Sequence, residues 1–139
     1  MPLTHAALLA RFDTWLAAWD AHDLDGVMAP MHVDVVFENW TGATVRGKRA
    51  LRRAWAPWFK EHGNFRFSTE DVFIDEAAQK LLFRWSLEWP APDAPSPARE
   101  IRRGVDVLHF IDGLIREKHS YSKTATQLAV APPGHFLES

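Results

Sequence analysis

An aspartate and a histidine near the end of the chain have the types and the spacing of an acid-base pair. Asp112-Gly113 separates two alternating runs, and an Asp-Gly pair in that position predicts a two-residue β-hairpin turn. Counting outward from this turn places Asp106 directly opposite His119. A carboxylate beside an imidazole can orient it as a general base near neutral pH. The pair therefore predicts proton-transfer chemistry on one face of the hairpin.

The same count brings Tyr121 to this face, opposite Gly104. Tyr121 is the expected phenolic donor to an oxygen that gains negative charge, and the glycine leaves space for a ligand. Leu108 and Glu117 form another pair on this face and are expected to line the same site. Two alternatives stay open: the acid and the imidazole form only a structural hydrogen bond, or Glu117 reaches solvent at the sheet edge. An inserted residue in either strand would reverse the faces.

Three further residues are candidates for ligand contacts. Asn39 ends a strand in which Val35, Phe37 and Asn39 share one face, so its amide is expected to point inward. The alternative is a turn residue at the strand end. Trp15 and Trp85 lie on apolar stripes and are expected to line a ligand, whereas most of the other tryptophans are expected to pack in the core.

Composition limits the classes of function. The 139 residues are 47% hydrophobic, and we expect a single domain over 1–139, with its core at about 5–124 and a tail at 125–139. A net charge of −2 without charge runs predicts neither a nucleic-acid nor an anionic-membrane partner. No apolar run is long enough to span a bilayer, and no signal peptide is recognisable, so we expect a cytoplasmic protein.

Metal and cofactor chemistry have no sequence support. The chain has no cysteine, its histidines lack the close spacings of a zinc site, and no glycine-rich phosphate loop is present. We therefore expect neither a metal nor a cofactor. Seven tryptophans and nine phenylalanines are unusual for this length, and they indicate either a wide core or an apolar ligand cavity.

Periodicity predicts the elements that must position these residues. An apolar stripe with helical spacing predicts the first helix, which is followed by a short helix, a strand and a longer helix that contains Pro57. After that helix, apolar residues recur at every second position, which predicts strands. The expected helices cover 4–22, 23–29 and 48–62. The expected strands cover 32–40, a segment that begins at 65, 81–89, 101–111 and 114–123, with a turn around 75–79, and the proline-rich run 90–97 is an exposed loop. This order predicts an α+β fold in which helices cover one face of a curved antiparallel sheet.

Two stretches of the chain resemble a known family. Trp19-Asp20-Ala21-His22-Asp23-Leu24-Asp25-Gly26 with Asp34-Val35-Val36-Phe37-Glu38-Asn39, and the hairpin around Asp112-Gly113, are similar to the nuclear transport factor 2-like superfamily. Within it the chain looks most like the SnoaL-like polyketide cyclase and ketosteroid isomerase branch. The resemblance covers about residues 5–124. It implies a cone-shaped fold in which helices packed on the concave face of the curved antiparallel sheet enclose a pocket, commonly with a dimer across the outer sheet face.

The catalytic groups of the relatives do not carry over. Trp15 replaces the tyrosine donor of ketosteroid isomerases, Asn39 replaces their proton-moving aspartate, and their neutral acid falls near Leu108. The carboxylate that many SnoaL-like cyclases have near the last strand is replaced by Ser122-Lys123. Any acid-base chemistry must therefore use other residues.

Two functions from different classes remain. The first is a cofactor-independent isomerase, cyclase or hydrolase acting on a largely apolar carbonyl substrate, with His119 as the base, Asp106 orienting it, and Tyr121 or Asn39 stabilising the oxygen. The second is a non-catalytic binder of an apolar small molecule, or a dimeric module with a filled pocket. The apolar face with Val105 and Val107 predicts a homodimer, unless the tail covers that face.

Overall fold

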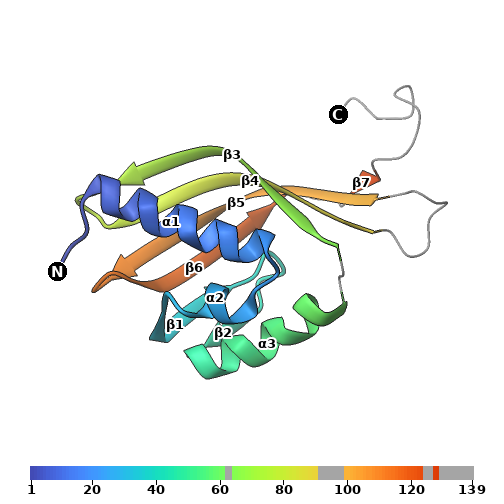
Figure 1. Ribbon diagram of the computed structural model, residues 1–139, viewed down its shortest axis with the longest axis horizontal. Helices are drawn as coiled ribbons and strands as arrows, with labels where there is room; N and C mark the ends of the chain where they lie inside the picture. The colour runs from blue at the N-terminus through green and yellow to red at the C-terminus, as the bar shows by residue number, and fades with distance from the viewer. Residues whose placement is uncertain (62–63, 91–98, 124–126, 129–139) are drawn as a thin grey trace.

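The predicted α+β class is confirmed by a computed structural model that describes residues 1–61, 64–90, 99–123 and 127–128 (Figure 1). The proline-rich loop lies outside the described residues beyond Pro90, and the predicted tail is described only at 127–128. The strands β2 and β7 were not expected from the sequence. In chain order the elements are α1 His5–Asp20, α2 Leu24–Met28, β1 Met31–Glu38, β2 Thr44–Arg46, α3 Lys48–Glu61, β3 Arg66–Asp75, β4 Lys80–Pro90, β5 Arg99–Ile111, β6 Leu114–Ser122 and β7 Gln127–Leu128.

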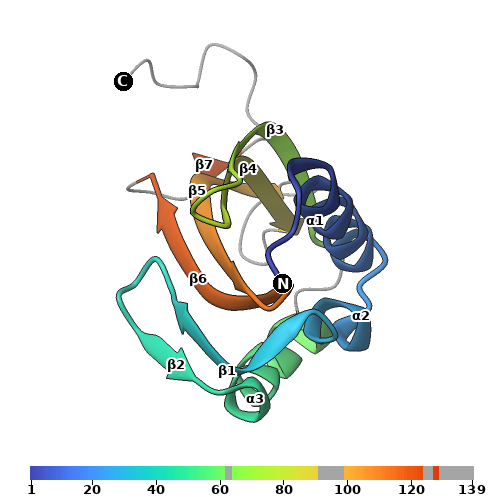
Figure 2. The same cartoon turned by 90° about the vertical axis from the view of Figure 1, so that its left-hand side faces the viewer.

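The strands form one curved sheet in the order β2-β1-β6-β5-β4-β3, and β7 pairs with β5. Seen end-on, the sheet bends around α1, α2 and α3, which lie on its concave side (Figure 2). The pairing is antiparallel except between β1 and β6, which run parallel. This parallel pair departs from the fully antiparallel sheet expected from the sequence. It also sets β1, with its inward-facing Phe37, directly beside β6.

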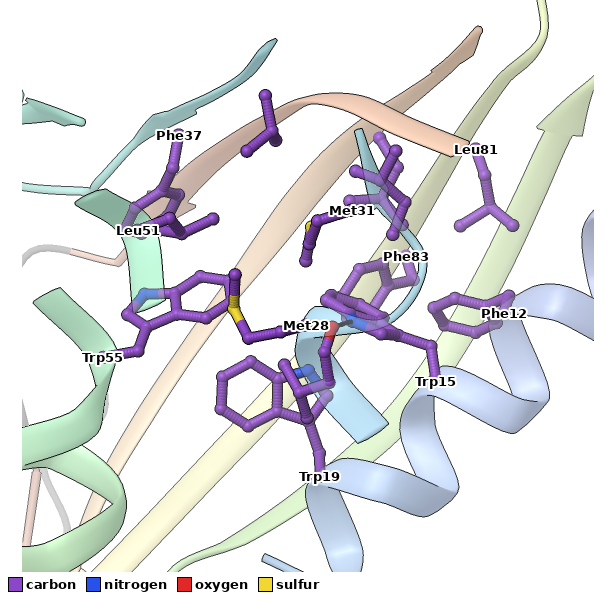
Figure 3. Packing of buried hydrophobic residues seen from close by; sticks show 14 of the residues in the cluster. Phe12, Trp15, Trp19, Met28, Met31, Phe37, Leu51, Trp55, Leu81 and Phe83 are labelled. Atoms are coloured by element: carbon purple, nitrogen blue, oxygen red, sulfur yellow. Dashed lines mark hydrogen bonds between the residues drawn. The ribbon is translucent and has the colours of Figure 1, made fainter. Parts of the chain in front are cut away.

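The interior between the helices and the sheet is built mainly from aromatic rings. Trp19 of α1 lies 5.2 Å from Trp55 of α3, measured between ring centroids, and the two rings meet edge to face (Figure 3). Trp15 and Phe12 lie on the same stripe of α1, and both pack against Phe83 of β4. Such pairs stabilise by about 0.5–1.5 kcal/mol beyond their apolar burial. The aromatic residues therefore hold α1 and α3 against the concave face.

The hairpin between β5 and β6 has the predicted turn but a different register. Asp112 and Gly113 both have positive φ, as a two-residue turn of this type requires, and Phe110 pairs with Ile115 as predicted. The next pair is His109 with Glu117, so Arg116 is an extra residue in β6. This β-bulge reverses the faces of all later residues in β6. The predicted pairing of Asp106 with His119 is therefore wrong.

Candidate functional site

The bulge places a buried ion pair on the concave face. Asp106 pairs with Ser120 in the ladder, and Lys118 lies on the same side of β6. The Nζ of Lys118 is 2.7 Å from Oδ2 of Asp106 and donates a hydrogen bond to Oγ of Ser120 at 2.9 Å. Asp106 is 4% exposed and Lys118 is 7% exposed. Two opposite charges are thus held away from bulk water, next to a hydroxyl group.

This pair lies in the wall of a cavity of about 290 Å³ between the sheet and the helices. Its polar lining consists of Asn39, Asp106, Lys118 and Ser120. The remaining lining is hydrophobic and comes from α1, α3, the sheet and the loop after β1: Trp15, Leu16, Trp19, Phe37, Trp40, Ala43, Val45, Ala54, Trp55, Trp58, Phe67, Phe83 and Leu87. A few convergent polar groups in an apolar cavity are typical of a small-molecule site.

Aromatic rings hold the ammonium group of Lys118 on its other side. Its Nζ lies 4.6 Å from the ring centroid of Phe37 and 5.6 Å from that of Trp55. Cation–π contacts of this kind are favourable when the cation is desolvated. An ammonium has three donors, and two of them are used by Asp106 and Ser120. Among the described residues the third donor has no partner, and Lys118 lines the cavity, so this donor can meet a ligand.

Trp85 fixes the aspartate from behind. Its Nε1 donates to Oδ1 of Asp106 at 3.0 Å, so each carboxylate oxygen accepts one hydrogen bond. Gly104 makes this possible, because a Cβ at that position would lie 2.7 Å from the indole ring of Trp85. The space expected beside Gly104 for a ligand is therefore filled by Trp85, and the ladder partner of Gly104 is Ser122 rather than Tyr121.

The other candidates for ligand contacts lie in different places. Trp15 lines the cavity with its ring, while its Nε1 donates to the carbonyl oxygen of Val27. Asn39 also lines the cavity, and its Oδ1 accepts the backbone N–H of Trp40, so its NH2 group is the part left for a ligand. Leu108 is fully buried in the core and is not among the lining residues. Trp85 is not among the lining residues, and it packs behind Asp106, Trp40 and Phe67, which are.

The remaining predicted residues lie on the outer face of the sheet. The Nδ1 of His119 lies 3.0 Å from Oε1 of Glu38, and its Nε2 lies 2.9 Å from Oε1 of Glu117. Glu117 also contacts Nδ1 of His109. Glu117, and more weakly Glu38, raise the pKa of His119 against the opposing effect of its partial burial. The hydrogen bonds from His119 and then His109 lower the pKa of Glu117.

This outer cluster is not connected to the cavity. Tyr121 is 55% exposed on the same outer side as His119, and its partner in the ladder is Val105. The expectation that His119, Tyr121 and Glu117 face a pocket together with Asp106 is therefore wrong in placement. The cause is the single extra residue, because side chains alternate between the two faces of a strand.

Lys118 and Ser120 are the residues that the sequence analysis missed. From Arg116 to Ser122 every residue except Tyr121 is charged or polar, or is a histidine, so β6 has no apolar alternation that marks its inner face. The signal that could have identified Lys118 lies on β1, where Phe37 belongs to an alternating apolar set. Phe37 is the ladder partner of Lys118, so the two side chains share a face.

The described residues offer no site for a resident metal. Within 1–61, 64–90, 99–123 and 127–128, no group of three or more His, Asp or Glu side chains is arranged to hold an ion. In the same part of the chain, no helix combines the length and apolar composition that crossing a bilayer requires.

The chain belongs to the SnoaL-like domain family, because the family model matches residues 12–118. This match bears out the resemblance noted from the sequence. No curated protein matches the sequence significantly. The match therefore establishes the family, and any reaction must be inferred from the geometry of the site.

Solved structures with the same fold have different roles. The Mycobacterium tuberculosis protein RV0760c in complex with estradiol-17beta-hemisuccinate is 21% identical, with a TM-score of 0.69 over 83% of this chain and 92% of that chain. A LEH-like epoxide hydrolase from the same organism is 20% identical, with a TM-score of 0.67 over 85% of this chain and 84% of that chain. A computationally designed 17-OHP binder is 18% identical, with a TM-score of 0.73 over 90% and 98%. At these identities the likeness establishes the fold alone.

Proposed function

We propose that this chain binds a largely apolar small molecule with a carbonyl oxygen and performs acid-base chemistry on it without a cofactor. The observation that carries the proposal is the buried pair of Asp106 and Lys118 in the wall of an otherwise apolar cavity. The ligand class follows from the lining, and the chemistry follows from the pair.

The lining selects an apolar body of limited size. Thirteen of the seventeen lining residues are hydrophobic, and most of these carry aromatic rings. The volume of about 290 Å³ lies just below the usual range for small-molecule sites, which is about 300–1,000 Å³. A flat ring system of two or three rings suits edge-to-face contacts with Trp15, Trp40 and Trp55.

The carbonyl oxygen is assigned to Lys118. The unused N–H of its ammonium and the O–H of Ser120 are donors at the cavity wall. Negative charge that develops on a carbonyl oxygen is stabilised strongly by preorganised donors where water is excluded. Asp106 and Ser120 supply that preorganisation, since they hold the ammonium in place before the ligand arrives.

Proton transfer is assigned to Asp106. It is the carboxylate in the described lining, and each of its oxygens keeps a lone pair beyond the bonds from Trp85 and Lys118. It would take a proton from the carbon next to the carbonyl group, and the electron pair of that C–H bond would form the enolate. Lys118 would then hydrogen-bond the enolate oxygen. The proposed base is therefore Asp106 in place of His119, and the proposed hydrogen-bond donor to the oxygen is Lys118 in place of Tyr121.

A non-catalytic binder is the second candidate, because both oxygens of Asp106 already accept hydrogen bonds. The structures with an estradiol derivative and with 17-OHP as named ligands support an apolar ligand for either candidate. The epoxide hydrolase supports chemistry in a cavity of this fold.

The test compares two probes that differ in one oxygen, 2-acetonaphthone and 2-ethylnaphthalene. Tryptophan fluorescence measures binding, and NMR in D2O measures deuterium exchange at the methyl group of the ketone. We expect the ketone to bind about tenfold more tightly, because a hydrogen bond to a charged group contributes about 1.5–3 kcal/mol. We also expect the protein to accelerate exchange.

The variants separate the candidates. Asp106→Asn should keep binding and abolish accelerated exchange, whereas His119→Gln on the outer face should change neither. If Asp106→Asn exchanged deuterium at the wild-type rate, acid-base chemistry by Asp106 would be rejected and the non-catalytic binder would remain. Failure of both probes to bind the wild-type protein would overturn the proposal as a whole.

We also propose a homodimer through the outer face of the sheet. Phe73, Ile111 and Tyr121 are large exposed side chains there, and Phe73 continues across the neighbouring strands in a row with Leu82 and Val107. Exposed apolar side chains on one sheet face are candidates for a protein interface, and a two-fold axis pairs such a face with itself. Light scattering should give twice the chain mass. Phe73→Ser with Tyr121→Ser should halve it, and Val33→Ser, on exposed β1, should not; a monomeric wild type would reject the dimer.

A further inference from the structure

The lysine in the cavity differs from the other lysines of the chain in its surroundings. Lys118 is 7% exposed and lines a cavity, whereas Lys60, Lys80 and Lys123 are exposed to solvent, and the half-buried Lys48 is not among the cavity-lining residues. A lysine in an apolar pocket with a proton acceptor beside it is the arrangement that serves amine nucleophiles. For Lys118 the acceptor is Oδ2 of Asp106, 2.7 Å from the nitrogen.

We infer that Lys118 is a nucleophile that condenses with an aldehyde bound in the cavity and forms an imine. This inference rests on the proposed function, since the same cavity must first admit a carbonyl compound. It goes further because it assigns a covalent bond to the lysine and narrows the carbonyl class to aldehydes, whose carbonyl carbon is the least hindered.

The step uses only groups at the cavity wall and the aldehyde itself. Lys118 passes one proton to Asp106, and the nitrogen lone pair then attacks the carbonyl carbon while the π electrons move to oxygen. That oxygen takes the proton back from Asp106, which gives a carbinolamine. The carbinolamine nitrogen still carries two protons, so Asp106 takes one of them and passes it to the hydroxyl group. The nitrogen lone pair then forms the C=N bond as the C–O bond breaks and water leaves, and the product is a protonated imine (iminium) on Nζ.

The surroundings favour the product once it has formed. The nitrogen lies 4.6 Å from the ring centroid of Phe37 and 5.6 Å from that of Trp55, so an iminium would keep the cation–π contacts of the ammonium. Ser120 already hydrogen-bonds the nitrogen and can hold the departing water. The apolar lining limits the access of further water, which slows hydrolysis of the imine.

The experiment incubates the full chain with 2-naphthaldehyde and cyanoborohydride, which reduces an iminium to a stable amine. Intact mass and peptide mapping then locate the added naphthylmethyl group. We expect one group per chain, on Lys118. Its rate of labelling should be at least about tenfold higher than that of Lys80 or Lys123, because the cavity positions the aldehyde beside Lys118. Excess 2-ethylnaphthalene should suppress labelling of Lys118 and leave labelling of the exposed lysines unchanged.

The control variants are Lys80→Arg, which should leave labelling of Lys118 intact, and Asp106→Asn, which should slow it about tenfold or more through loss of the proton acceptor. Tryptophan fluorescence without the reductant reports reversible binding of the aldehyde. If the aldehyde binds but the label appears only on exposed lysines, the imine is rejected and the proposed function stands. If the aldehyde does not bind and Lys118 is not labelled, both are rejected.

Discussion

The concave and outer faces of the β5–β6 pair carry similar chemical groups in different surroundings. On the concave face, Asp106 and Lys118 lie 2.7 Å apart among aromatic rings. On the outer face, Glu117 and His119 lie 2.9 Å apart, with Glu117 about 40% exposed. The two faces differ by one step along β6. The comparison teaches that position along the strand, more than residue type, decides which acid-base pair is shielded from water.

The energetic difference between the faces follows from the dielectric. Exposed pairs are screened by water and contribute about 0–1 kcal/mol. A buried pair gains more from mutual attraction, but each charge loses its hydration, so removal of one partner leaves an uncompensated charge. The concave pair should therefore be sensitive to substitution, and the outer cluster should be tolerant.

The largest expected effect is that of Asp106→Ala. It leaves the ammonium of Lys118 buried without its counter-ion, and removal of one partner of such a pair costs about 3–5 kcal/mol of unfolding free energy. Urea denaturation measures the loss. Asp106→Leu with Lys118→Met should recover most of it, whereas Glu117→Ala on the outer face should cost less than about 1 kcal/mol. Equal losses at the two faces would break the comparison.

A smaller effect is expected from Trp85→Phe. This change removes the indole N–H that Asp106 accepts, and a hydrogen bond to a charged group contributes about 1.5–3 kcal/mol. Trp15→Phe is the matched control, because it removes the same atoms from another buried indole whose N–H meets the neutral carbonyl of Val27. The difference between the two losses of unfolding free energy, measured by urea denaturation, gives the extra contribution of a hydrogen bond to the charged Asp106. A loss for Trp15→Phe as large as that for Trp85→Phe would contradict it.

The smallest effect belongs to the outer cluster and depends on pH. The pKa of His119 is raised by Glu117 and Glu38, so its stabilisation is complete below about pH 6.5, its ordinary pKa, and is lost as pH rises through the raised value. The pKa of Glu117 is lowered, so its share is present above about pH 4.5 and is lost as pH falls. Stabilisation is greatest between these two limits.

His119→Gln checks this window. Because the cluster is partly exposed, the substitution should cost less than about 1 kcal/mol at pH 5.5 and still less at about pH 8.5. Urea denaturation of both proteins at the two pH values measures it, and ketone binding serves as the control that should not change. A larger cost at the higher pH would reverse the sign and contradict the assignment.

Much of the fold could be predicted from local patterns. The stripe with Phe12, Trp15 and Trp19 predicted α1, and the alternation around Phe83 and Trp85 predicted β4. Local patterns suffice here because helices and strands with one buried face must repeat their apolar residues at the period of the backbone. The parallel pairing of β1 with β6 has no local signature, since it joins segments about 80 residues apart.

The candidate site was predicted only in part. Asp106 and Asn39 were predicted to lie on the inner face because apolar residues at every second position of β5 and β1 share that face with them. Both side chains line the cavity. Lys118 was missed because its neighbours Glu117 and His119 are as polar as it is, so no register of β6 buries more apolar area than another by local count.

By itself the sequence determined the helices, the inner faces of β1, β4 and β5, and the turn at Asp112-Gly113, because periodicity and turn chemistry act between near neighbours. Only the tertiary structure decided which face of β6 meets the cavity. The extra residue Arg116 and the ladder contact with Phe37 turn Lys118 inward and His119 outward. The physical reason is that burial of a polar strand is set by the strands beside it, and these are brought together only when the sheet forms.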